Sequence, residues 1–351
     1  MVQSKENIIR AIRFERPDYI PVNFSINDAC WQAYEHDLLF ELMETHPLLF
    51  PHFQRPSGPY APRFGLVARR DEPYSDDFGC LWQTTVDGIT GVVTGHPLRD
   101  WSAYADWTLP DPEQCSGIGP VSWPAVASDV TARRARGELT WGALRHGHTF
   151  LQLCDLRGYE NLLYDMADET PLLWDLIRRL ETFNAAIIRH YLDLDVDMLM
   201  YAEDLGMQNG PMLSPAYFRK YIKPSYRRLM QPARDRGKIV HMHSDGHLHD
   251  LIDDLLDGGV EVINLQDLVN GIDWIAQRLA GRVCVELDID RQQITTGGTP
   301  EQIDELIRTE VSRIGRREGG LMLLFGLYPG TPVRNIKALM DAMERYAGYF
   351  N

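Results

Sequence analysis

Two histidines stand two positions apart at the end of a short apolar segment, residues 238–243 (KIVHMH). On a β-strand, residues i and i+2 project to the same face, so His241 and His243 would point the same way. Zn²⁺ accepts imidazole nitrogen and carboxylate oxygen, and a catalytic zinc uses three protein ligands with one open position. Asp245 follows directly, and Glu203 ends the preceding apolar segment. We therefore take His241, His243, Glu203 and Asp245 as candidate metal ligands.

A second interpretation of these residues stays open, in which one histidine is a hydrogen-bonded core residue and the other binds substrate. Glu203 and Asp204 could form a general acid/base pair or a cation site, although neighbours on a strand face opposite ways. Under either interpretation, the candidate catalytic residues are Glu203, His243 and Asp245.

Further polar residues follow other apolar segments. Glu286 and Asp288 alternate along residues 282–288, where they would either contact substrate or form salt bridges with Arg291. Tyr328 follows a glycine and would be a loop anchor or a substrate lid. His146 and His148 form a second pair at i and i+2. From this group we take as candidate substrate-binding residues Glu286, Asp288, Arg291, Tyr328 and His148.

Alternating strands and helices would position these residues. Apolar runs predict strands at 197–202, 238–243, 260–265, 282–287 and 321–325, with weaker candidates at 20–25 and 139–150. Helical spacing fills the intervals between them, and Pro224 and Pro232 are expected to divide or kink the helix over 214–237. Thr299 and Thr331, each followed by proline, are predicted N-caps of the last two helices.

The predicted fold class is α/β, a (β/α)₈ TIM barrel, because strand–helix alternation implies parallel strands with crossover helices. Seven strands are identified and the eighth is not. A doubly wound sheet is the alternative, but no GxGxxG follows any strand. The chain reads as one domain, 1–351, in which residues 50–136 are an insertion that caps the barrel mouth. Within it, residues 80–95 predict a hairpin that turns at Asp87-Gly88.

Composition excludes several classes of function. The 351 residues include 35 Lys+Arg and 50 Asp+Glu, a net charge of −15. This acidic balance argues against binding to nucleic acid or to an acidic membrane surface. No apolar run approaches the roughly 20 residues of a membrane span, and the first residues do not predict a signal peptide. Five cysteines without a CxxC pair indicate reduced thiols, so we expect a cytoplasmic protein.

Several motifs resemble the uroporphyrinogen decarboxylase superfamily, and within it the branch similar to corrinoid-dependent (cobamide) methyltransferases. They occur in the order expected for this superfamily along nearly the whole chain: SKENIIRAIRFERPDYIPVNF at 4–24, RGYEN at 157–161, EDLG at 203–206, QNG at 208–210, HSDG at 243–246, DRQ at 290–292 and GTP at 298–300. The resemblance implies a TIM barrel with its site in the mouth, and often a homodimer. It also adds Asn209, of the QNG motif, to the candidate substrate-binding residues.

The chain departs from two patterns of this superfamily. Uroporphyrinogen decarboxylases carry an arginine-bearing MRQAGRY segment that binds substrate carboxylates, whereas residues 23–28 (NFSIND) contain no arginine. Thiol-activating methyltransferases use HxC and a later cysteine as zinc ligands. Here Asp245 stands at the first cysteine position, and the later one falls near Gly326. A nitrogen and oxygen site suits an ether or amine donor better than a thiol.

The resemblance therefore implies a methyltransferase-like enzyme that takes a methyl group from a small methoxylated or N-methyl substrate. Zinc would act as a Lewis acid, and a separate corrinoid protein would accept the methyl group, since the chain has no DxHxxG cobalamin motif. The alternatives are a metal-free decarboxylase or lyase on the same scaffold, and a catalytically silent binding homologue.

Overall fold

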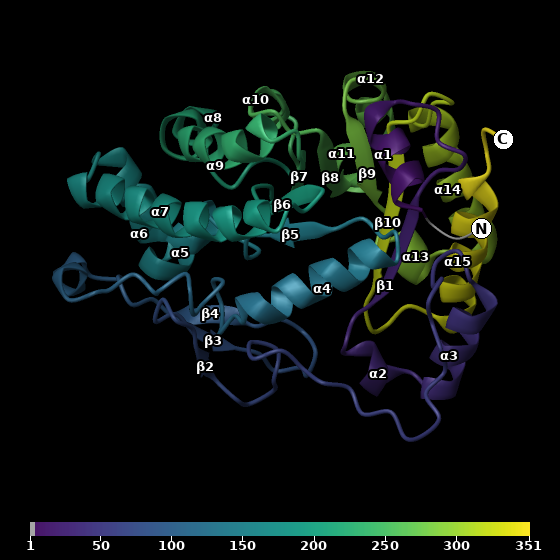
Figure 1. Cartoon of the computed structure of the whole chain (residues 1–351), viewed down its shortest axis with the longest axis horizontal. Helices are drawn as coiled ribbons and strands as arrows, with labels where there is room; N and C mark the ends of the chain where they lie inside the picture. Colours follow the sequence, from purple (N-terminus) through teal and green to yellow (C-terminus); the bar gives the residue numbers. More distant parts are fainter. Residues whose placement is uncertain (1–3) are drawn as a thin grey trace. The chain divides into compact units, whose positions relative to one another are not determined.

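Parallel strands joined by helices make up most of residues 4–351, which the structure, a computed structural model, describes (Figure 1). The chain divides into two compact units. The first consists of the chain up to Ala68, Val86–Thr90 and Val262–Asn351, and the second of Arg69–Thr85 and Gly91–Glu261.

The first unit holds four parallel strands in the order β1-β10-β9-β8. These strands are β1 (Val22–Ile26), β8 (Val262–Gln266), β9 (Cys284–Asp288) and β10 (Leu321–Leu327). The helices of this unit are α1 (Lys5–Arg13), α2 (Cys30–Ala33), α3 (His36–Thr45), α11 (Asp267–Asn270), α12 (Ile272–Arg278), α13 (Ile294–Gly297), α14 (Pro300–Ile314) and α15 (Val333–Ala347).

The last two helices lie side by side, and their first residues differ in capping (Figure 1). Thr299 caps α14 as predicted, in a capping box with Gln302. The predicted cap Thr331 is wrong, because the N-cap of α15 is Pro332 and its side chain makes no capping bond. Thr331 is instead buried, and its carbonyl accepts the Tyr34 hydroxyl at 2.8 Å.

The second unit holds three parallel strands, β5 (Trp141–Ala143), β6 (Met198–Asp204) and β7 (Ile239–Asp245), with β6 between the other two. A separate antiparallel sheet contains β2 (Tyr74–Ser75), β3 (Leu81–Gln83) and β4 (Val92–Gly95). The helical segments are η1 (Trp101–Ala105), α4 (Trp123–Ala135), α5 (Phe150–Arg157), α6 (Tyr159–Ala167), α7 (Pro171–Asp193), α8 (Pro215–Tyr217), η2 (Phe218–Ile222), α9 (Lys223–Asp235) and α10 (Ile252–Asp257).

Most of the predicted elements are confirmed. Each predicted strand in the C-terminal half overlaps an observed one, and the pairing of β3 with β4 confirms the hairpin around Asp87-Gly88. Pro224 stands at the start of α9, after a turn of π-helix, so the predicted division of that helix is confirmed at this proline. Pro232 lies inside α9 and does not divide it. The strand over 139–150 was predicted too long, because β5 ends at Ala143 and Phe150 already begins α5.

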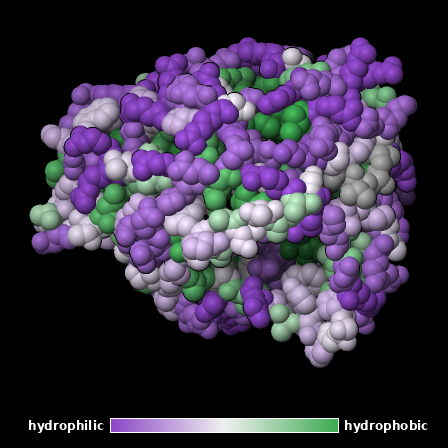
Figure 2. Space-filling model, viewed as in Figure 1, coloured by the Kyte–Doolittle hydropathy of each residue, from purple (hydrophilic) through white to green (hydrophobic). Residues whose placement is uncertain are grey.

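The predicted alternation of parallel strands and helices is therefore confirmed, with seven parallel strands among the described residues. No helix within residues 4–351 is long and apolar enough to cross a membrane. All five cysteines are buried and free. Hydrophilic residues predominate on the face drawn in Figure 2, in keeping with the charged composition.

Candidate metal and catalytic site

The carboxyl ends of β6 and β7 bring acidic and imidazole side chains together. The strands pair with Ala202 opposite His243 and Asp204 opposite Asp245. Because side chains alternate along a strand, Asp204, His243 and Asp245 share one face, and Glu203 lies on the other. The register therefore decides which of the two adjacent acidic residues of β6 meets the histidines.

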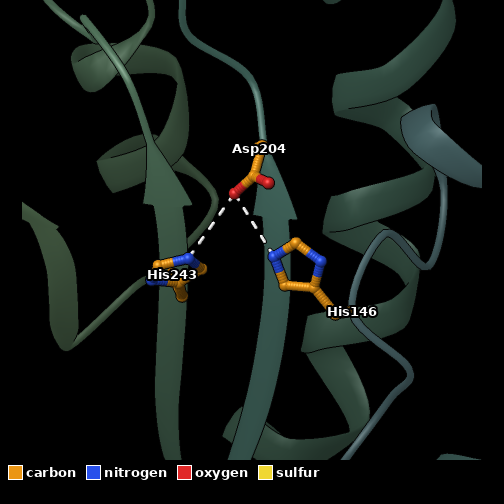
Figure 3. Close-up of side chains that lie close together, drawn as sticks. All are labelled: His146, Asp204 and His243. Carbon is orange, nitrogen blue, oxygen red and sulfur yellow. Dashed lines mark ion pairs between the residues drawn. The ribbon is translucent and has the colours of Figure 1, made fainter. Parts of the chain in front are cut away.

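A second histidine reaches Asp204 from the loop between β5 and α5. His146 Nε2 lies 3.2 Å from Asp204 Oδ1, and His243 Nε2 lies 3.5 Å from the same oxygen (Figure 3). The three residues each offer one ligand atom, and these atoms all lie within 4.8 Å of one another. We call His146, Asp204 and His243 the strand-end triad.

The histidines control the ionisation of the carboxylate at the centre of the triad. Burial raises the pKa of Asp204, but hydrogen bonds from His146 and His243 and their positive charge outweigh burial and hold this pKa well below its ordinary value. The Asp245 N–H also donates to Asp204 Oδ1 at 3.2 Å, and Asp245 Oδ1 lies 3.8 Å from His243 Nε2. Asp204 is therefore a carboxylate at neutral pH.

The donor set of the triad fits a zinc ion. Two imidazole nitrogens converge on one carboxylate oxygen, and nitrogen and oxygen donors of this kind are those that catalytic zinc sites use with three protein ligands. The side chains of His146, Asp204 and His243 are 49%, 32% and 20% exposed, so solvent or a substrate can reach them. Asp245 is close enough to His243 to orient it or to contribute a further oxygen.

Glu203 is fully buried and lies on the face of β6 opposite to Asp204. Its carboxylate accepts the backbone N–H groups of Thr149, Phe150 and Leu151 at 3.1, 2.9 and 3.0 Å. The Tyr226 hydroxyl of α9 donates to it as well. These backbone groups belong to the start of α5, where the first turn has donors without helical partners. The structure thus does not bring Glu203 together with His243 as a metal ligand.

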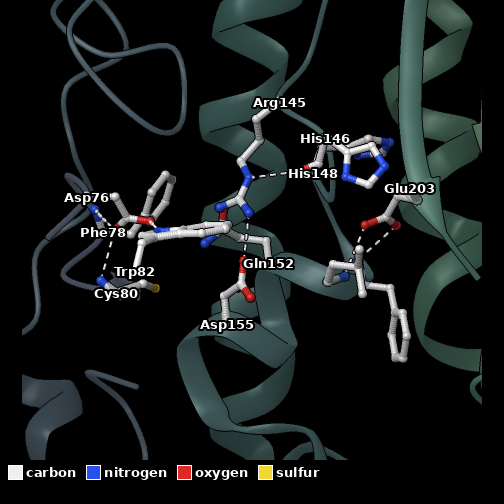
Figure 4. Close-up of polar contacts among 12 residues, drawn as sticks. Asp76, Phe78, Cys80, Trp82, Arg145, His146, His148, Gln152, Asp155 and Glu203 are labelled. Carbon is white, nitrogen blue, oxygen red and sulfur yellow. Dashed lines mark hydrogen bonds and ion pairs between the residues drawn. The ribbon is translucent and has the colours of Figure 1, made fainter. Parts of the chain in front are cut away.

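Arg145 fixes the loop next to His146. Its Nε donates to the His146 carbonyl at 3.0 Å, and its Nη2 lies 2.6 Å from the Asp155 carboxylate (Figure 4). Gln152 accepts a further hydrogen bond from this guanidinium. The Arg145 side chain is only 5% exposed, so this ion pair is a buried one whose separation would leave an uncompensated charge.

The other predicted residues of this unit lie in different surroundings. His241 is on the face of His243 but is buried. His148 is also buried, with its ring near Tyr226 and its Nδ1 2.7 Å from Thr149 Oγ1; burial lowers the pKa of His148 to about 4. Asn209 is exposed in the loop that follows β6.

The first unit brings three of its four predicted residues together. Arg291 Nη2 lies 2.9 Å from the buried Asp288 carboxylate, and the guanidinium stands over the Tyr328 ring at 5.6 Å. Glu286 lies two positions before Asp288 on β9, on the same face, and is half-buried. The Tyr328 side chain is exposed. Substrate binding by these residues stays a prediction.

Our candidate site residues did not include His146, although the sequence analysis noted its pairing with His148. Reading the two as strand neighbours would place both on one face, but the segment is a loop in which Gly147 has φ +73°. One histidine therefore reaches Asp204 and the other enters the core. The feature of the sequence that could have identified His146 as a site residue is its position next to a glycine, just after a short strand.

Residues 86–346 match the family model described as uroporphyrinogen decarboxylase (URO-D). Two curated relatives, the uroporphyrinogen decarboxylases of two strains of Thermus thermophilus, are each 28% identical over 188 residues. These alignments cover 52% of this chain and 51% of each relative. The chain thus spans about half the length of the curated relatives it matches.

Among solved structures, a methyltransferase from Methanosarcina mazei is similar over nearly the whole length of both chains. The match covers 97% of this chain and 98% of that one, with a TM-score of 0.65 and 18% sequence identity. At this identity the likeness establishes the fold, and it confirms the predicted α/β barrel class.

Proposed function

Since the chain belongs to the uroporphyrinogen decarboxylase family, we propose that it is a methyltransferase-like member, which removes a methyl group from a small methoxylated or N-methyl compound and passes it to a corrinoid protein. The observation that carries this proposal is the strand-end triad. It offers nitrogen and oxygen ligands in place of the thiolates that thiol-activating enzymes use.

In the proposed site, His146 and His243 would hold zinc through Nε2, and Asp204 through Oδ1. Bound zinc would supply Lewis acidity at the ether oxygen or amine nitrogen of the substrate. A corrinoid on a separate protein would supply the methyl acceptor.

The chain's own residues contribute position and charge. Before metal binds, Asp204 is ionised and accepts from both imidazoles, so it brings the two Nε2 atoms to one point at neutral pH. Asp245 flanks His243, and its carboxylate lies 3.8 Å from Nε2, where it can orient this ring. Arg145 keeps the loop of His146 against the helix that follows it.

The test measures zinc content and methyl transfer in the same preparations. We expect the purified protein to retain zinc after dialysis, and to lose it in the variants His146→Ala, Asp204→Asn and His243→Ala. Methyl transfer to cob(I)alamin would be followed by absorbance with a panel of methoxylated aromatic and N-methyl compounds. Absence of both zinc and transfer across the panel would refute the proposal.

A decarboxylase or lyase is the second candidate. Its support is that the relatives with sequence similarity are uroporphyrinogen decarboxylases, and that His243 lies within 4 Å of two carboxylates and could donate a proton. In this case metal-free protein would release CO₂ from an aromatic acid, and chelators would leave the rate unchanged.

A further inference from the structure

We propose that Glu203 is a positioning residue, which holds the loop of His146 so that this histidine meets Asp204. Glu203 would thus support the metal site from the opposite face of β6, by holding the loop and not by binding the metal. The inference rests on the proposed function in one respect, namely that His146 is a ligand.

The first residues of the His146 loop are attached to β6. The Leu144 N–H donates to the Met200 carbonyl at 3.1 Å, and the Gly147 N–H donates to the Ala202 carbonyl at 2.8 Å. His146 therefore lies next to a residue that is bonded to the strand bearing Asp204. These contacts fix the entry to the loop, but they do not fix its exit.

Glu203 fixes that exit. Its carboxylate binds the N–H groups of residues 149–151, which begin three positions after His146. Glu203 and Asp204 are successive residues of β6 and face opposite ways. The end of β6 thus presents Asp204 to His146 on one face. On the other face, Glu203 binds the end of the His146 loop, and we call its hydrogen bonds to residues 149–151 and Tyr226 the clamp. Any rotation of this segment would disturb both contacts together.

The clamp depends on two oxygens that only accept hydrogen bonds. Oε1 accepts from Thr149 and Leu151, and Oε2 accepts from Phe150 and from the Tyr226 hydroxyl. Glutamine has the same shape but carries one NH₂ in place of an oxygen. With this NH₂ at the Oε1 position, the Thr149 and Leu151 N–H groups would lose their acceptor; at the Oε2 position, the Phe150 N–H would lose its acceptor, whereas the Tyr226 hydroxyl can turn and accept. Because Glu203 is fully buried, water cannot replace the lost acceptor.

The experiment compares Glu203→Gln with Asp197→Asn as a matched control. Asp197 stands at the other end of β6 and also ties it to the chain entering β5, accepting the Thr140 N–H at 2.9 Å and its hydroxyl at 2.8 Å. Both substitutions replace a carboxylate that accepts hydrogen bonds from a neighbouring segment, but only Glu203 lies beside the His146 loop. Tyr226→Phe removes a single donor from the clamp and serves if Glu203→Gln does not fold.

Two readouts are measured on the full chain. The first is amide hydrogen exchange of residues 144–151 in metal-free protein, followed by mass spectrometry. The second is affinity for Co²⁺, followed by its visible absorption. We expect Glu203→Gln to accelerate exchange in this segment and to weaken Co²⁺ binding about 10- to 100-fold, as for other residues that support metal ligands. The control should leave both unchanged, and Tyr226→Phe should show the same changes to a smaller extent.

The outcomes separate the inference from the proposed function. If the wild-type chain binds no Co²⁺, the proposed function fails, and the exchange measurement still decides whether Glu203 holds the loop. If Glu203→Gln or Tyr226→Phe leaves both exchange and affinity at the wild-type values, the inference is overturned. It is also overturned if Asp197→Asn weakens Co²⁺ binding as much, because the effect would then follow from general loss of stability.

Discussion

Glu310 of α14 gives the chain a pH-dependent stability. Its side chain is fully buried. Burial, and then the negative charges of Asp267 and Asp290, raise the pKa of Glu310 well above its ordinary value. Asp290 is held in place by accepting N–H groups at the start of α13, so it cannot move away from its neighbours without breaking these bonds. The native state therefore keeps Glu310 protonated at a pH where the unfolded chain has lost the proton.

The sign of the effect follows from proton linkage. A carboxyl whose pKa is raised on folding contributes stability that is fully present below the unfolded pKa, about 4.3. As the pH rises towards the folded pKa, the unfolded state is favoured by about 1.4 kcal/mol per pH unit. Glu310→Gln keeps the shape of the neutral acid and removes the titration. The difference in free energy of unfolding between this variant and the wild type should therefore increase with pH at that slope.

Urea unfolding at a series of pH values measures this difference, in which the titration of groups that do not interact with Glu310 cancels. The matched control is Glu305→Gln in the same helix, because Glu305 is exposed and pairs with Arg308 at the surface. Its free-energy difference from the wild type should stay nearly constant, since such pairs contribute about 0–1 kcal/mol. A flat difference for Glu310→Gln as well would refute the assignment of a raised pKa to the native carboxyl.

Three other substitutions test features of the fold. In Gly246→Ala, the new Cβ would collide with the Gly206 backbone at a φ of +83°, so we expect a loss of at least about 1 kcal/mol in urea unfolding, together with weaker zinc binding. Asp165→Asn breaks a buried pair with Arg157 (2.7 Å) and should cost about 3–5 kcal/mol by the same assay; a loss near zero would contradict the burial of this pair. Thr299→Ala removes the cap of α14 and should lower the stability by about 1 kcal/mol, whereas Thr331→Ala should remove no cap, a contrast that thermal unfolding can check.

The strands of the C-terminal half could be predicted because each is a short apolar run followed by polar residues. That pattern identified the ends of β6 and β7, and therefore the neighbourhood of Asp204 and His243. The loop of His146 could not be predicted in the same way. Residues 139–150 contain apolar and β-prone residues, but only Trp141–Ala143 form a strand. The residues that follow form a loop, because Gly147 turns the chain and Glu203 accepts the N–H groups that begin α5.

The choice between Glu203 and Asp204 as partner of the histidines depends on one residue of register. In the observed pairing Asp204 stands opposite Asp245 and shares the face of His243. A shift of β6 by a single residue would exchange the two faces, placing Glu203 beside the histidines and Asp204 against the helices. Alternation along the sequence shows which residues of one strand share a face. Which face of one strand matches which face of its neighbour is set by contacts between residues distant in sequence. Here they include the four donors that bind the Glu203 carboxylate, and a shifted strand would leave these donors buried without an acceptor. The group that fixes the register is therefore the one that sequence reasoning takes for a metal ligand.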